Sequence, residues 1–292
     1  MNLTCKRSLQ KLLLPAAALL SLATVVRAQH YPDGAEGIRG ATLPPPGVYL
    51  RDYNFFYFAD RFPGGPPGFD AFAYVNAPRL IWITEQKILG ADYGMDIIVP
   101  FGYTRVKFAG LEDHRFGLHD IQIEPLLLSW HLQQFDFAGG YAVWAPTGDF
   151  DTSHFVNLGE GFWTHMLTAG ATWYPDTEKT WAISVLNRYE INQEQQDTHV
   201  TYGQTFTMEL GVSKTVAKGL DVGLVGYWSQ QVTENTGPFT TDSLSHVFAL
   251  GPEISGVIPK IGVIVSARYL REFAAKDASE GNTVVLTLTK RF

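Results

Sequence analysis

Few residues in this chain could support catalysis or bind a metal. Ser153 and His154 are adjacent in one segment, and Asp149 and Asp151 precede them. A serine hydrolase needs a hydroxyl and an imidazole that point toward each other, whereas adjacent residues of an extended segment point oppositely. The aspartates and the histidine give only a loose cation-binding spacing without a full ligand set. We therefore expect a solvated acidic loop here, with no catalytic residue, no metal and no cofactor; the common nucleotide, zinc-protease and hydrolase motifs are also absent.

A second set of charged residues lies on the polar face of segments in which apolar and polar residues alternate. Arg188 and Glu190, for example, alternate with Tyr189 and Ile191. The set comprises Glu124, Arg188, Glu190, Glu209, Glu253 and Arg268. If the apolar faces contact lipid, these six side chains line an internal lumen. They then form either a selective polar pathway or an internal salt-bridge network that holds the barrel and partly plugs it. Intramembrane charges usually pair, which favours the network, and a substrate that displaces part of it would reconcile the two.

The elements that must position these residues are strands. Alternation of period two indicates twelve of them, each long enough for the ~9–11 residues of a tilted transmembrane strand. Their expected ranges are 47–59, 70–84, 93–107, 117–131, 134–146, 160–174, 180–192, 201–216, 219–233, 243–257, 260–273 and 281–292.

The connections between these strands alternate in length. Those after even-numbered strands are short, apart from a longer one at 85–92, and those after odd-numbered strands are long, as at 60–69, 108–116 and 147–159. Short turns on one rim and long loops on the other are typical of transmembrane barrels. The sequence therefore predicts an all-β fold: an antiparallel transmembrane β-barrel of about 12 strands, with both termini on the short-turn side.

The N-terminal residues have the pattern of a cleavable signal peptide. Lys6, Arg7 and Lys11 precede an apolar run, and Val26-Arg27-Ala28 provides a small-residue cleavage pattern. Residues 1–28 would then be removed, together with Cys5, the single cysteine, which leaves no thiol for disulfides or zinc–thiolate sites. Removing four of the 22 basic residues leaves 18 against 29 acidic ones, a net charge of −11. A chain this acidic is a poor partner for nucleic acid.

The chain ends in a strand that stops on an aromatic residue. Val284, Leu286, Leu288 and Phe292 fall on one face of residues 283–292. This ending resembles the C-terminal signature of bacterial outer-membrane barrels, and we expect Phe292 to be recognised by the barrel-assembly machinery. Trp130, Trp173, Tyr174 and Trp181 flank the predicted short turns, where aromatic rings favour the membrane–water boundary. The alternative is that these aromatics form the core of a soluble protein.

Five prolines oppose the strand assignment. Pro78, Pro100, Pro125, Pro146 and Pro252 fall inside or at the ends of predicted strands. Proline cannot donate to a β-ladder, and a closed barrel has no free edge to hold it. We therefore expect bulges or strand ends at these positions.

We expect the barrel to comprise residues 47–292. Two segments near its start indicate what its lumen contains. Residues 29–46 are rich in proline and glycine, and they form either a plug inside the lumen or a flexible periplasmic leader. In Phe55-Phe56-Tyr57-Phe58 both faces of the strand are aromatic, so one aromatic face must point inward. An aqueous porin does not need such a face. We therefore expect Tyr53, Phe55 and Tyr57 to contact an apolar cargo, whereas His114, His119 and Asp120 are interpreted as rim residues.

Several motifs resemble one known family. They are Tyr31-Pro32-Asp33-Gly34-Ala35-Glu36-Gly37, Leu43-Pro44-Pro45-Pro46-Gly47 and Tyr49-Leu50-Arg51-Asp52-Tyr53, then Gly117 to Asp120 with Glu124-Pro125-Leu126, and Gly139-Gly140-Tyr141 with Ala145 to Gly148. Together they look like the meta-pathway phenol-degradation protein family. The resemblance implies an outer-membrane barrel that passes hydrophobic substrates, distantly similar to the fatty-acid channel family, and it implies no catalytic residue.

These observations favour a porin-like channel of the bacterial outer membrane for passive uptake of small hydrophobic compounds, including aromatic ones. Its expected partners are outer-membrane lipid and a small hydrophobic ligand, and we expect a monomer. One alternative is a structural or ligand-binding barrel with a sealed lumen. The third and least favoured is a barrel hydrolase.

Overall fold

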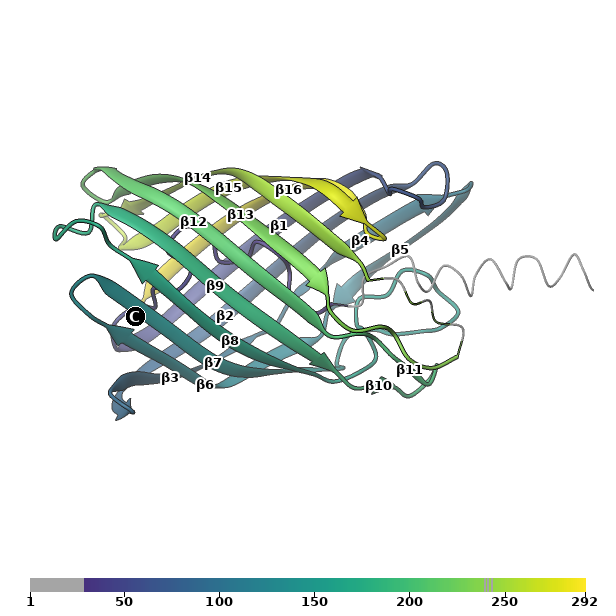
Figure 1. The fold of residues 1–292 in the computed structure, drawn as a ribbon, viewed down its shortest axis with the longest axis horizontal. Helices are drawn as coiled ribbons and strands as arrows, with labels where there is room; N and C mark the ends of the chain where they lie inside the picture. The colour runs from purple at the N-terminus through teal and green to yellow at the C-terminus, as the bar shows by residue number, and fades with distance from the viewer. Residues whose placement is uncertain (1–28, 239, 241, 243) are drawn as a thin grey trace, which may run out of the picture.

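The alternating segments form one continuous antiparallel wall (Figure 1). The computed structural model describes residues 29–238, 240, 242 and 244–292. The predicted signal peptide, with Cys5, lies outside these residues. The wall segments are β1 (Gly47–Arg61), β2 (Asp70–Ile88), β3 (Ala91–Ile98), β4 (Phe101–Phe108), β5 (Leu111–Leu118), β6 (Ile121–His131), β7 (Phe135–Ala145), β8 (Thr164–Trp173), β9 (Trp181–Asn192), β12 (Thr205–Ala217), β13 (Leu220–Gln231), β14 (His246–Ile258), β15 (Val263–Lys276) and β16 (Glu280–Arg291). A short hairpin of β10 (Glu194–Gln195) and β11 (Val200–Thr201) lies in the loop between β9 and β12.

Pairing of the first and last strands closes the wall. β1 pairs antiparallel with β16, from Tyr49 opposite Arg291 to Arg61 opposite Glu280, and with β2 on its other side. β3 and β4 are successive parts of one wall strand, since both pair with β2. β5 and β6 are likewise one strand, because β5 pairs with β4 and β6 pairs with β3. The fourteen segments therefore make twelve wall strands, and the predicted closed transmembrane barrel is confirmed.

Several predicted connections differ in length from the structure. The expected loop at 108–116 is wrong, since β4 and β5 continue to a two-residue turn at Ala109 and Gly110. The expected longer turn at 85–92 is also wrong, because Leu89 and Gly90 alone join β2 to β3. Both residues of each turn have positive φ, the geometry of tight two-residue hairpins. β4 stays paired with β2 as far as Lys107, whereas β5 on the other side of the hairpin extends beyond the end of β7 (Figure 1).

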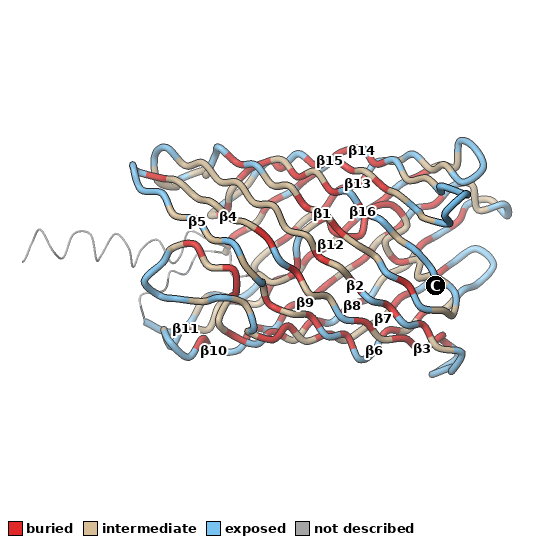
Figure 2. The backbone as a smooth tube through the Cα atoms, turned by 180° about the vertical axis from the view of Figure 1, so that it is seen from behind, coloured by how far each residue is buried: buried red, intermediate tan, exposed pale blue. Residues whose placement is uncertain are grey.

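Side chains separate by face as the alternation predicts. In β12 the residues Thr205, Thr207 and Glu209 are buried, whereas Leu210 and Val212 are exposed on the outer surface. Buried and exposed positions alternate along the strands (Figure 2). An outer surface of this kind suits acyl chains, and the charged residues collect inside. Among the described residues, no helix is both long and apolar enough to span a membrane.

The aromatic residues near the short turns do not all face outward. Trp173 and Trp181 are exposed on the outer surface, as a boundary residue should be. Tyr174 is buried, and its hydroxyl donates to Asp136 Oδ2 at 2.5 Å. Its assignment to the aromatic boundary is therefore wrong, because the chain leaves β8 at Trp173 and the next side chain turns inward.

The prolines coincide with irregularities of the ladder. Pro125 lies where the pairing of β6 with β7 shifts register between Ile123 and Leu126. Pro100 lies in the interruption between β3 and β4, and Pro146 directly follows β7. Pro78 and Pro252 remain within β2 and β14. The expected bulges and strand ends are confirmed for Pro125, Pro100 and Pro146.

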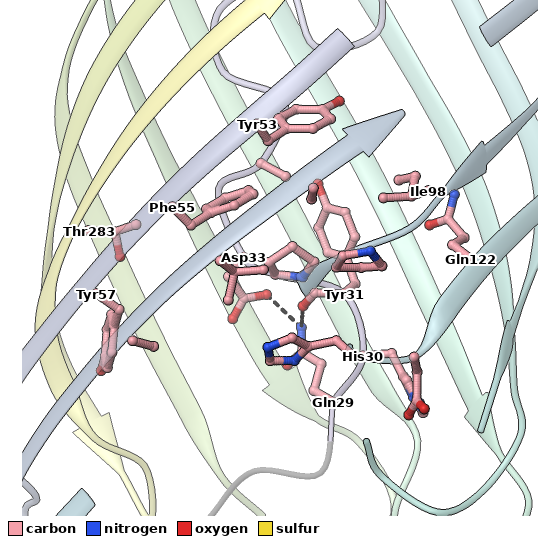
Figure 3. Close-up of a pocket in the computed structure, with 18 of the residues that line it drawn as sticks. Gln29, His30, Tyr31, Asp33, Tyr53, Phe55, Tyr57, Ile98, Gln122 and Thr283 are labelled. Carbon is pink, nitrogen blue, oxygen red and sulfur yellow. Dashed lines mark hydrogen bonds and ion pairs between the residues drawn. The ribbon is translucent and has the colours of Figure 1, made fainter. Parts of the chain in front are cut away.

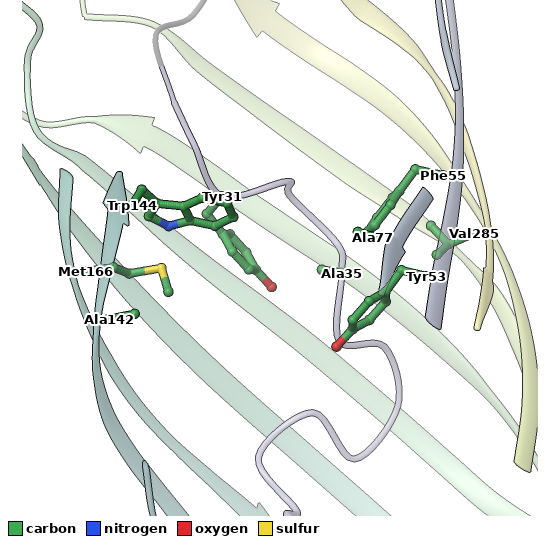
Figure 4. Close-up of a cluster of buried hydrophobic side chains, with 9 residues drawn as sticks. All are labelled: Tyr31, Ala35, Tyr53, Phe55, Ala77, Ala142, Trp144, Met166 and Val285. Atoms are coloured by element: carbon green, nitrogen blue, oxygen red, sulfur yellow. The ribbon is translucent and has the colours of Figure 1, made fainter. Parts of the chain in front are cut away.

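Residues 29–46 lie inside the barrel. Tyr31, Ala35, Glu36 and Ala41 are buried there, and the segment contacts side chains from several strands (Figure 4). Tyr31 and Ala35 pack in one apolar cluster with Tyr53, Phe55 and Ala77 of the wall, and with Ala142, Trp144, Met166 and Val285 on other strands. This segment therefore supplies part of the core of the barrel.

Candidate binding cavity and lumen network

Glu36 of the internal segment is the centre of the charged network. Its carboxylate forms ion pairs with Arg51 of β1 at 2.9 Å, Arg79 of β2 at 2.8 Å and Arg188 of β9 at 3.4 Å. Arg79 and Arg188 are as buried as Glu36. One carboxylate thus joins β1, β2 and β9 to the segment that precedes β1.

Arg79 extends this network to the next strands of the wall. Its guanidinium reaches Asp96 Oδ2 at 2.5 Å on β3 and Glu124 Oε2 at 2.9 Å on β6. With Glu36, it therefore contacts three carboxylates, all of them buried. A guanidinium suits this position because it stays charged and presents several donors in one plane.

Backbone groups of the internal segment are held by wall carboxylates. Glu209 of β12 accepts from the backbone N–H groups of Gly34 and Ala35 at 3.0 Å and of Glu36 at 3.1 Å. It also accepts from the hydroxyl of Tyr31. Glu190 of β9 accepts from the Tyr31 backbone N–H at 3.0 Å.

A further pair holds the next turn of the same segment. Glu253 of β14 accepts from the Ile38 backbone N–H at 2.9 Å and pairs with Arg268 of β15 at 3.3 Å. Arg268 in turn donates to the carbonyls of Gly34 and Ala35. A Cβ at Gly37, which has φ +69°, would lie 2.1 Å from Glu253, so only glycine fits there.

All six charged residues expected in the lumen are buried inside the barrel. Five of them contact the internal segment, and Glu124 contacts Arg79. Sequence reasoning missed four members of the same network: Glu36, Arg51, Arg79 and Asp96. The available signal was alternation, since Arg51 shares a face with Tyr53 and Phe55, and Arg79 shares a face with Ala77 and Ile81. A partner inside a proline-rich segment has no periodic pattern to identify it.

A cavity of about 380 Å³ lies beside the internal segment (Figure 3). The inner faces of β1 and β2 give it an apolar wall made of Tyr53, Phe55, Tyr57, Val75 and Ala77, and Ile98 and Trp144 add to this wall. The three residues expected to meet an apolar cargo, Tyr53, Phe55 and Tyr57, all line this cavity. Its volume falls within the range of small-molecule sites.

One end of the cavity is polar and lies near the interruption of β5 and β6. His30 Nε2 is 2.8 Å from Asp120 Oδ2, and these side chains are only 2% and 3% exposed. Asp120 also accepts from the backbone N–H groups of Gly148 at 2.8 Å and Glu160 at 2.7 Å. The expectation that His119 and Asp120 are rim residues is therefore wrong, since both line the cavity. His114 is exposed, as a rim residue would be.

The acidic loop between β7 and β8 pairs with the projecting hairpin. Arg115 of β5 binds Asp149 and lies 3.7 Å from Asp151. His154 Nδ1 lies 3.1 Å from Asp113 Oδ2, and Asp113 also accepts from the Val156 backbone N–H at 3.2 Å. The charged residues of the loop therefore have a structural role. The loop covers β5 at a level of the wall that β7 does not reach, because β7 pairs only with β6.

Comparison with known proteins places this architecture in a family. Residues 54–288 match the family described as putative MetA-pathway of phenol degradation. The chain belongs to this family. The match extends from within β1 almost to the end of β16, so it includes nearly the whole wall. No curated protein matches the chain significantly.

Solved structures share the fold at low sequence identity. An outer membrane channel from Pseudomonas putida F1 superposes with a TM-score of 0.77 at 14% identity, covering 90% of this chain and all of that one. The transport unit of the autotransporter AIDA-I from Escherichia coli gives 0.53 at 11% identity, covering 94% and 97%. The translocator domain of NalP from Neisseria meningitidis gives 0.53 at 8% identity, covering 87% and 91%. At these identities the likeness establishes the barrel fold of this chain.

Proposed function

We propose that this protein is an outer-membrane channel for the passive uptake of small hydrophobic compounds, aromatic ones among them. The observation that carries the proposal is the cavity, because a lumen lined only by charge and water would not need its apolar wall. Six aromatic or aliphatic side chains of β1 and β2 line it, as does Trp144 of β7. A cavity of about 150 Å³ with an apolar lining already binds benzene, so 380 Å³ accommodates a single-ring compound.

The family and the fold support this proposal in different ways. The family description refers to phenol degradation, and the P. putida protein of the same fold is an outer membrane channel. In this chain the outward apolar faces suit outer-membrane lipid, and Phe292 ends the chain next to β1, where its N–H donates to Val48 O at 2.9 Å. We propose export through a cleaved signal peptide, recognition of Phe292 by the assembly machinery, and a monomer that transports without catalysis.

The internal segment is then the plug of the channel. Its contacts with Glu209, Glu253 and four arginines hold it in the lumen, so a compound must displace part of it or pass beside it. A barrel with a permanently sealed lumen is the second candidate, and the extent of the buried charge network favours it. Transport across a membrane separates the two, because a sealed barrel passes nothing.

The decisive experiment is uptake of toluene into proteoliposomes that contain the purified protein. Val75→Phe places a larger ring in the cavity, and we expect it to reduce uptake strongly. Leu286→Phe is the matched control, since Leu286 is exposed on the outer surface of β16. Equal uptake by protein-free liposomes and by liposomes with the wild-type protein would refute the channel.

A further inference from the structure

Three ring nitrogens at the polar end of the cavity are buried without a hydrogen-bond partner among the described residues. They are His30 Nδ1, His119 Nε2 and Trp144 Nε1. All three side chains line the cavity, and the rings of His30 and Trp144 stack with their centroids 5.6 Å apart. Buried polar groups are rarely left unsatisfied, so three of them in one cavity indicate a polar group of a ligand.

The remaining bonds of these rings define what the ligand must offer. His30 Nε2 binds the Asp120 carboxylate, which accepts, so a neutral His30 carries its proton on Nε2 and Nδ1 accepts. His119 donates to the backbone of Leu158, which likewise makes its Nε2 an acceptor in the neutral ring. Trp144 Nε1 can only donate. The cavity thus presents two acceptors and one donor.

The charges around this end restrict the ligand further. Asp120 and Glu160 both line the cavity, and Glu190 lies close enough to Glu160 to act on it electrostatically. The negative charge of Asp120 would repel a carboxylate or phenolate there. An ammonium group would be attracted, but it has no acceptor for Trp144. An uncharged hydroxyl donates one hydrogen bond and accepts another, so it can pair with Trp144 Nε1 and with one of the two histidine nitrogens at a time.

We infer that His30, His119 and Trp144 form a recognition site for the uncharged hydroxyl group of a hydrophobic ligand, whose apolar body lies against Tyr53, Phe55 and Val75. This inference rests on the proposed function and narrows its substrate class to hydrophobic alcohols and neutral phenols. Its polar and apolar parts come from different elements: the internal segment, the β5–β6 junction and β7 hold the hydroxyl, and β1 and β2 hold the body.

The test uses the full mature protein in lipid nanodiscs and ¹⁹F NMR of 4-fluorophenol, fluorobenzene and 4-fluorobenzoate. Partition into empty nanodiscs is subtracted. We expect 4-fluorophenol to bind about three- to tenfold more tightly than fluorobenzene, the effect of one or two hydrogen bonds, and 4-fluorobenzoate to bind most weakly. Trp144→Phe should bring the ratio of phenol to benzene affinity close to one and leave fluorobenzene binding intact. His119→Phe should lower the same ratio.

Trp228→Phe is the matched control, because Trp228 lies on the outer surface and stacks on Phe248. An unchanged ratio in Trp144→Phe would mean that water alone satisfies the three nitrogens, and it would overturn the inference. An equal loss of both ligands in that variant would also overturn it, since the ring would then act only by packing. A wild-type protein that takes up toluene but binds 4-fluorophenol no more tightly than fluorobenzene refutes this inference alone. A wild-type protein that shows the hydroxyl preference but no uptake refutes the proposed function alone.

Discussion

Single carboxylates in the lumen differ in what surrounds them. Glu36 has three arginines around it, whereas the Glu160 side chain makes no hydrogen bond or ion pair with the described residues. The first is a structural hub, and the second is a carboxyl group that burial disfavours in its charged form. Different experiments test these two situations.

Glu36→Gln should strongly destabilise the barrel. The substitution leaves Arg51, Arg79 and Arg188 without their shared counter-charge, and breaking a buried ion pair in this way costs about 3–5 kcal/mol. Urea unfolding in lipid vesicles measures the change in the free energy of unfolding. Glu85→Gln, at an exposed position of β2, should change it very little. Equal effects of the two substitutions would contradict the assignment of Glu36 as the hub.

Glu160 should make the stability of the protein depend on pH. Burial, reinforced by the nearby charges of Asp120 and Glu190, raises the pKa of Glu160 to about 8. Between its ordinary value of 4.5 and about 8, the folded protein therefore binds more protons at this residue than the unfolded chain. Stability should fall as pH rises through this window and level off above it. Glu160→Gln should flatten that slope in urea midpoints measured from pH 5 to pH 8, and an identical slope would refute the assignment.

At the scale of elements, β1 and β2 carry a polar cluster on the face opposite the cavity. Asp52 accepts from Asn76 Nδ2 at 2.8 Å and from Asn54 Nδ2 at 3.1 Å, and the Tyr74 hydroxyl donates to Asn54 Oδ1 at 3.0 Å. Along β1, Leu50 and Phe56 flank this cluster on the same face. It therefore lies in the middle of the lipid-facing band, where polar groups must satisfy one another.

Asn76→Leu should destabilise the barrel by about 1–3 kcal/mol, because it removes a donor from the Asp52 carboxylate at that depth. The triple change Asp52→Leu, Asn54→Leu and Asn76→Leu removes the polar groups together, and it should recover most of the loss. The free energy of unfolding in lipid vesicles is the measurement. A triple variant less stable than Asn76→Leu would show that the cluster contributes more than mutual satisfaction.

The sequence predicted the strands where one face meets lipid and the other meets the lumen. In β9 and β12 buried and more exposed positions alternate over most of the strand, and the expected ranges lie close to the observed ones. Prediction failed where this asymmetry ends. A loop was expected at Glu112, Asp113, His114 and Arg115 because these residues carry no apolar face. They belong instead to β5, which pairs with β4 and extends beyond the end of β7.

The candidate site was predictable only in part, for a similar reason. An extra aromatic face within one strand is a local signal, and it predicts Tyr53, Phe55 and Tyr57. His30 and Glu36 belong to a segment without periodicity. His30 lies 90 residues from its partner Asp120, and Glu36 lies 152 residues from its partner Arg188. Contacts of this kind depend on the closed barrel and leave no local signal in the sequence.

At the scale of the whole molecule, the barrel and its internal segment should be separable. Deleting residues 30–45 removes Glu36 but leaves ion pairs between nearby wall strands, including Arg79 with Glu124 and Arg268 with Glu253. The wall should still close through β1 and β16, and ion conductance in planar bilayers should rise severalfold. Tyr31→Phe, which retains the segment, is the control. Unchanged conductance after the deletion would mean that the segment does not obstruct the lumen.

The position of residues 29–46 also constrains the order of biogenesis. These residues precede β1, yet they contact β9, β12, β14 and β15, while the seam that encloses them joins β1 to β16, the last strand made. The segment must either settle against the nascent wall before the seam forms or thread into a finished cylinder afterwards. In the first case, weakening the contacts of the segment with the wall should slow the final pairing of β1 with β16 in the cell.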